Sequence, residues 1–85
     1  MDFVFTETFY ATYESLSDRD AAPVDEGIRR LMVDHATGWA RQGRIEGEKG
    51  SAWILTVVTR HFEASLYWEY QDAERILLLA LVARR

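Results

Sequence analysis

The period of the apolar residues changes along this 85-residue chain, and this change most strongly limits what the chain can fold into. Residues 2–6 alternate polar and apolar side chains of β-prone types, which predicts a short strand. Apolar residues then recur at positions 9, 13 and 16, which is the spacing of one face of a helix. The chain therefore begins with a strand that is followed by a short helix, capped by Thr6 or Thr8.

Apolar residues keep helical spacing from Val24 to Trp39 and charged residues occupy the other face, which predicts a second amphipathic helix. Pro23 constrains the start of this helix. A proline within the first turn removes no hydrogen bond, whereas a proline deeper in the helix does. This favours Asp20 over Ser17 as the N-cap. Gly38 stands where a left-handed residue would end the helix, and the short break before the helix predicts an antiparallel helix hairpin.

The second half of the chain changes to strand patterns after a segment rich in glycine. Residues 38–50 hold four of the five glycines and predict a long loop. Three strands follow, over residues 53–58, 61–70 and 76–83. The last of these is apolar at every position, which predicts a central strand covered on both faces, whereas the alternating middle strand should have a more exposed face. The expected fold is a single α+β domain over residues 1–85, of order β-α-α-β-β-β, with the helix hairpin packed on a mostly antiparallel four-stranded sheet.

Composition excludes several classes of protein. The chain has no cysteine, which excludes disulfide scaffolds and thiolate chemistry, and its two histidines make a poor metal site, so no cofactor is expected. The longest apolar run has eight residues, far fewer than the roughly 20 that cross a bilayer. Asp2 stands where a signal peptide would be basic, so we expect a cytoplasmic protein without membrane contact.

Charge is distributed unevenly between the two halves. The net charge is −4, which taken alone argues against a nucleic-acid partner. Residues 1–35 carry three Arg against eight acids, giving −5, and residues 36–85 carry seven basic residues against six acids, giving +1. An anionic ligand is therefore expected at the second half.

The order of elements at this length resembles the toxins of the RelE/ParE superfamily of type II toxin–antitoxin modules. The resemblance covers essentially the whole chain. Residues 43–57 (GRIEGEKGSAWILTV) are similar to the family's Gly-rich, basic approach to its second strand. Residues 65–84 (SLYWEYQDAERILLLALVAR) look like its closing hairpin, with a tyrosine-bearing strand, an acidic turn and an aliphatic strand that ends on a basic residue.

The resemblance implies a function and partners. RelE-like members are ribosome-dependent endoribonucleases that cut mRNA without a metal ion and so inhibit translation, whereas ParE-like members inhibit DNA gyrase. An antitoxin protein holds both kinds inactive. We expect a toxin that cleaves mRNA on the ribosome, with a cognate antitoxin as partner; a homodimer or a hetero-oligomer with the antitoxin is left open. A gyrase inhibitor and a non-catalytic interaction module with the same fold remain alternatives.

Cleavage of RNA by attack of its own 2′-hydroxyl needs a base, and cations around the phosphate. The resemblance places Glu46 and Lys49 in the loop where members carry a general base or a functional lysine, and Arg84 at the position of a phosphate-binding residue. Arg60 and His61 share a predicted turn, and histidine is suited to proton transfer near neutral pH. These five residues are the expected catalytic set, and all five are expected to border one end of the sheet. RNA contact is expected from Arg44, Tyr67 and Arg85.

Two positions depart from the family pattern. Ala64 stands where members of both branches usually carry an arginine, three residues before Tyr67, and the chain ends on two arginines where ribonuclease members often carry a tyrosine. A candidate for the acid that protonates the leaving oxygen is therefore missing, and Ala64 together with the acidic net charge favours the gyrase alternative. Structural roles are expected for the remaining ring side chains: His35 lies on the apolar stripe of the second helix as a hydrogen-bonded core or boundary residue, and Trp39 and Trp53 continue core patterns.

Overall fold

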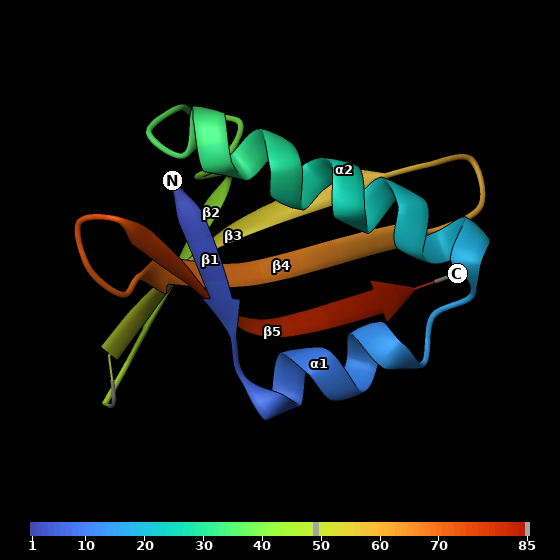
Figure 1. The fold of residues 1–85 in the computed structure, drawn as a ribbon, viewed down its shortest axis with the longest axis horizontal. Coiled ribbons are helices and arrows are strands. Elements are labelled where there is room, and N and C mark those ends of the chain that lie inside the picture. The colour runs from blue at the N-terminus through green and yellow to red at the C-terminus, as the bar shows by residue number, and fades with distance from the viewer. Residues whose placement is uncertain (49, 85) are drawn as a thin grey trace.

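The computed structural model describes residues 1–48 and 50–84, in which two helices and five strands form an α+β fold (Figure 1). Lys49 and Arg85, both expected at the site, lie outside the described residues. The elements in chain order are β1 (Asp2–Phe5), α1 (Glu7–Glu14), α2 (Asp18–Asp34), β2 (Gly43–Gly47), β3 (Gly50–Val58), β4 (Glu63–Tyr70) and β5 (Arg75–Arg84).

The start of the chain follows the prediction of a strand and a short helix. Thr6 is the N-cap of α1, since its hydroxyl accepts a hydrogen bond from the Phe9 amide at 3.1 Å. The same hydroxyl donates to the Leu79 carbonyl at 2.7 Å, which ties the cap to β5. Phe9 is buried, so α1 contributes one aromatic anchor to the core.

The N-cap of α2 is Ser17, and the prediction of Asp20 was wrong. The Ser17 hydroxyl accepts from the Asp20 amide at 3.2 Å, and the Ser17 carbonyl accepts from the Ala21 amide at 2.8 Å. Asp20 instead lies in the first turn, buried, with its carboxylate 3.5 Å from the Arg19 guanidinium. Acidic residues in the first turn favour the positive end of the helix dipole, so the helix begins early and contains Pro23.

The end of α2 also differs from the prediction. The C-cap is His35, in right-handed backbone geometry, and Gly38 does not have a positive φ. Turns after the helix, including the hydrogen bond from the Thr37 amide to the Asp34 carbonyl, close it without a left-handed glycine. Figure 1 shows α1 and α2 running in opposite directions, as expected for a hairpin, and the Tyr13 hydroxyl donates to the Asp25 carboxylate at 2.5 Å between them.

The sheet has five strands in the order β1-β5-β4-β3-β2, with β1 parallel to β5 and the other pairs antiparallel. The prediction of four strands was wrong because β2 lies inside the segment that was predicted as a loop. Strand β2 pairs with β3 from Gly43 opposite Ile54 to Gly47 opposite Gly50. Gly50 has φ +130°, a conformation that glycine adopts readily, and it stands at the end of this hairpin.

One face of the sheet carries the helices and the core. The largest fully buried side chains include Leu31 from α2, Leu55, Leu66 and Trp68 from β3 and β4, and Ile76 from β5. The Trp68 indole donates to the Ala40 carbonyl at 2.9 Å, which fixes the segment after α2 against the sheet. No helix in residues 1–48 and 50–84 is long and apolar enough to pass through a bilayer.

The other face, called the open face below, carries no helix and its apolar side chains stay half-buried or exposed. Strand β5 was expected at the centre with both faces covered. It is instead the neighbour of the edge strand β1, and β4 is the central strand. Strand β5 is apolar throughout because the open face is itself apolar. The pairing of the strands gives the open face Ile45 from β2, Ile54 from β3, Tyr67 from β4, and Leu77, Leu79 and Val82 from β5.

Candidate functional site

Three of the expected site residues meet at the turn between β3 and β4. Thr59 builds this turn: its hydroxyl accepts from the His61 and Phe62 amides at 3.3 and 3.1 Å, and its amide donates to the Phe62 carbonyl at 2.8 Å. The Phe62 ring is buried and anchors the turn in the core. Arg60 and His61, between these two anchors, are therefore held exposed at the tip.

Arg84 joins this turn from β5. Register places it opposite Glu63 at the start of β4, and its guanidinium lies 3.8 Å from the Glu63 carboxylate. The two arginines and His61 line one shallow, open hollow of about 410 Å³, called the turn pocket below. Its other lining residues are Val58, Thr59, Phe62 and Glu63. Two permanent cations and an imidazole around one hollow can hold a phosphate group and move a proton.

Glu46 lies at the opposite end of the sheet, so the expectation that the whole catalytic set borders one end was wrong. It pairs with Ser51, which precedes Val58 by seven positions along β3. At about 3.4 Å per residue this is roughly 24 Å of strand. The Glu46 carboxylate accepts from the Arg44 guanidinium at 3.2 Å, and Arg44 also donates to the Ser51 hydroxyl at 2.7 Å. Arg44 and Glu46 therefore form a local pair on the β2–β3 hairpin.

Tyr67 lies in the middle of the open face, between Ile54 on β3 and Ala80 on β5. The register between β4 and β5 shifts at Tyr67 and Trp68, so Leu79 is an extra residue at this point. Tyr67 is half-buried, and the neighbours that register gives it are apolar rather than cationic. The turn pocket and Tyr67 belong to the same face but not to one hollow.

A cluster that the sequence did not predict lies at the other end of β4. Arg41 donates to the Tyr70 hydroxyl at 2.8 Å, and this hydroxyl also lies 2.7 Å from Nδ1 of His35. Arg41 further donates through Nε to the His35 carbonyl at 3.1 Å. The prediction that His35 is a hydrogen-bonded core or boundary residue agrees with this half-buried position. No carboxylate of the described residues pairs with Arg41.

Arginine guanidiniums lie over the rings of two tryptophans in this region. The guanidiniums of Arg41 and Arg44 lie 4.9 and 4.3 Å from the Trp53 ring centroid, and Arg30 lies 4.0 Å from that of Trp39. Both tryptophans are partly buried and pack against the core, so the structural role expected for them holds. Arg41 and Tyr70 are 29 positions apart in the sequence, so no local pattern could have revealed this cluster.

Within the described part of the chain, no three His, Asp or Glu side chains gather closely enough to hold a metal ion. No family model matches the chain, and no curated protein is significantly similar to it. The functional conclusion therefore depends on the fold and on the geometry of the turn pocket.

Proposed function

We propose that this protein is a toxin of the RelE/ParE kind and that it cleaves mRNA on the ribosome, with RNA phosphate bound in the turn pocket. The observation that carries the proposal is the convergence of Arg60, His61 and Arg84 from two separate segments on one open hollow. A hollow this open suits a polymer that crosses it better than a small molecule that needs enclosure.

The four ionisable residues of the pocket each have a role in this reaction. His61 takes the proton of the 2′-hydroxyl as that oxygen attacks the adjacent phosphorus, and the bond to the 5′-oxygen breaks. The products are a 2′,3′-cyclic phosphate and a 5′-hydroxyl, and the leaving oxygen receives its proton from water. Arg60 and Arg84 stabilise the added negative charge on the phosphate. Glu63 lies 3.8 Å from Arg84 and holds its guanidinium near the pocket when RNA is absent.

Glu46 has no part in this proposed site, because it lies at the hairpin end of the sheet and is paired with Arg44. The function further implies a cytoplasmic protein with ribosome and mRNA as targets and an antitoxin as its inhibitor. The supporting features are the strand–helix–helix start, the mixed sheet with β1 parallel to the last strand, and the basic end of β5.

Induced expression in a bacterial host tests the proposal. We expect mRNA to be cut within translated regions, and each of Arg60→Gln, His61→Ala and Arg84→Gln to lower cleavage by about one to three orders of magnitude. Glu46→Ala and Arg29→Gln, which change exposed residues that do not line the pocket, are the matched controls and should cleave like the parent protein. Intact mRNA on expression of the folded parent protein would falsify the proposal.

The open face favours a second candidate function, inhibition of a protein target such as DNA gyrase. Its half-buried Leu77 and Leu79 and exposed Val82 offer apolar contact to a protein, whereas RNA binding needs cations. An SOS response with gyrase-linked DNA breaks, and no mRNA cleavage, would select this function.

A further inference from the structure

The open face is apolar at its centre and charged at its two ends. Its centre is formed by Ile54, Tyr67, Leu77, Leu79 and Val82, which no helix covers. Side chains of this type on a monomer are usually scattered singly rather than gathered on one sheet face. The gathering therefore indicates a surface that is covered by another protein.

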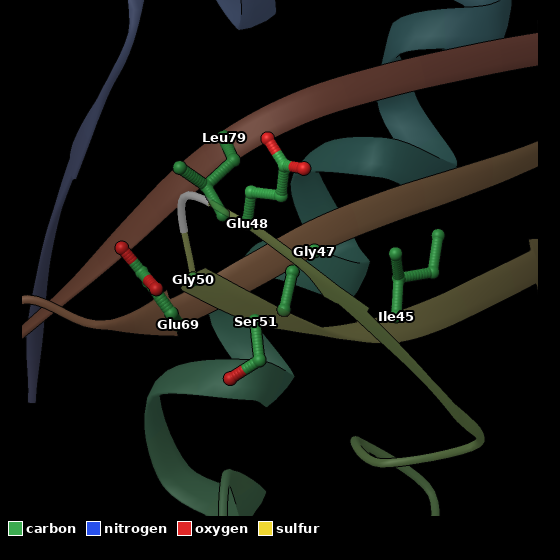
Figure 2. A pocket seen from close by; sticks show the side chains of 8 residues that line it. Ile45, Gly47, Glu48, Gly50, Ser51, Glu69 and Leu79 are labelled. Carbon is green, nitrogen blue, oxygen red and sulfur yellow. The ribbon is translucent and has the colours of Figure 1, made fainter.

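The end of the open face beside the β2–β3 hairpin is hollow and acidic. A groove of about 530 Å³ runs from this hairpin to Leu79 on β5, with Ile45 and Ala52 in its wall (Figure 2). Figure 2 shows the carboxylates of Glu48 and Glu69 at its rim. No ion pair joins either of them to a cation of the described residues. Lys49 follows Glu48 in the sequence, and the formal charges of Glu48, Glu69 and Lys49 together give −1.

The opposite end of the open face is basic and holds the turn pocket. It carries the turn with Arg60 and the end of β5 with Arg84, against one acid, Glu63. Val58 lies beside them and is 69% exposed, although β3 places it on the same face as Ile54. This end therefore presents an exposed apolar side chain with arginines around it.

We propose that two copies of this chain pack open face to open face, about a two-fold axis that runs across the strands. This axis places the acidic end of each copy over the basic end of its partner and brings the exposed Val58 to the groove of the partner. An axis along the strands would instead bring acidic end to acidic end and basic end to basic end. Because sheets pack about 10 Å apart, the central apolar side chains of the two copies interdigitate.

The proposal uses only the charge and the apolar side chains of the open face. The dimer covers the turn pocket, so RNA and the second copy compete for Arg60 and Arg84. The proposal commits the face to one occupant, a second copy, because the acidic end and the basic end of a single chain have complementary charges and flank the same apolar centre. The interface is isologous, so every contact occurs twice.

Sedimentation equilibrium of the purified full chain tests the proposal. We expect a reversible dimer with a Kd of about 10 to 100 µM, the range of a small interface. A chain that stays monomeric up to about 1 mM overturns the proposal and leaves the face to a different partner.

Charge reversal tests the orientation of the two copies. The double variant Glu48→Lys/Glu69→Lys has two basic ends, and Arg60→Glu/Arg84→Glu has two acidic ends. Each alone should dimerise at least about tenfold more weakly, whereas a mixture of the two should form a heterodimer at least as tight as the parent dimer. The matched control Glu14→Lys/Glu26→Lys changes two exposed helix residues by the same charge and should dimerise like the parent. A mixture that does not associate overturns the proposed axis.

Two valine variants distinguish contact at the open face from a general effect of added charge. Val58→Asp should weaken the dimer at least about tenfold, because the charge would enter an apolar hollow. Val33→Asp introduces the same charge on α2, at a side chain that is 78% exposed, and should have no effect. Equal dimerisation of the two variants, both folded, overturns the proposal.

Discussion

The hydroxyl of Tyr70, the last residue of β4, accepts a hydrogen bond from the Arg41 guanidinium at 2.8 Å, which joins the segment after α2 to the sheet. Arg41 in turn lies over the Trp53 ring, at 4.9 Å from its centroid. One arginine thus connects the chain after α2 with β3 and β4, next to the buried contact between Trp68 and Ala40. The irregular segment between α2 and β2 is held by side chains rather than by regular pairing.

Removal of the Tyr70 hydroxyl measures this connection. Tyr70→Phe keeps the ring, which packs edge-on against Trp68 at 5.3 Å, and should lower the free energy of unfolding by about 1 kcal/mol. A double-mutant cycle with Arg41→Gln in urea denaturation should give a coupling energy of about 0.5 to 1 kcal/mol. Additive effects of the two substitutions would show that the hydrogen bond does not contribute to stability.

The N-cap of α2 can be tested in the same way. Ser17→Ala removes the hydroxyl that accepts from the Asp20 amide and should cost about 1 kcal/mol of stability. Ser15→Ala is the control, since the Ser15 hydroxyl donates to the Thr12 carbonyl and caps no helix start. An unchanged urea midpoint for Ser17→Ala would show that the Ser17 hydroxyl does not cap α2.

Most of the regular structure follows from local patterns in the sequence. Both helices, β1 and the last three strands were predicted, because their apolar residues repeat at the period of the element that they form. The N-cap at Asp20 was a wrong prediction, since the rule for proline in a first turn outweighed the capping serine. Asp20 lies buried in that turn instead, which the spacing of charged residues does not reveal.

The strand β2 and the site depend on long-range pairing, and local patterns do not encode it. GRIEG has two glycines and only one β-branched residue, so its strand state comes from pairing with β3. The pairing also decides that Glu46 and Arg60 lie at opposite ends of the sheet. The sequence predicted that Arg60, His61 and Arg84 would lie together, because a turn and the end of a strand are both visible in it.

The turn between β4 and β5 gives a prediction for acid pH. Asp72 accepts from the Glu74 and Arg75 amides at 2.8 and 2.9 Å, and from the Arg75 side chain at 2.9 Å. The Glu74 amide first, and the Arg75 side chain second, hold the pKa of Asp72 below its ordinary value of 3.8. A lowered pKa in the folded state contributes stability that is complete above this ordinary value and is lost as the pH falls below it.

Asp72→Asn should therefore be less stable than the parent protein at pH 7, and the difference should shrink between about pH 4 and pH 2. Urea midpoints of both proteins across this range give the measurement. Glu14→Gln, which changes an exposed acid on α1, serves as the control and should show no such convergence. A difference between parent and Asp72→Asn that stays constant with pH would contradict the role given to the carboxylate.

The buried indole of Trp68 gives the last prediction. Trp68 is fully buried in the central strand, and its Nε1 donates to the Ala40 carbonyl at 2.9 Å. Trp68→Phe leaves this buried carbonyl without its donor and opens a space beside it, so we expect a loss of about 2 to 4 kcal/mol of unfolding free energy. The control, Trp53→Phe, changes a half-buried ring and should cost less, because solvent already reaches this ring. An equal loss for the two variants would mean that the hydrogen bond to Ala40 adds nothing beyond the burial of an aromatic ring.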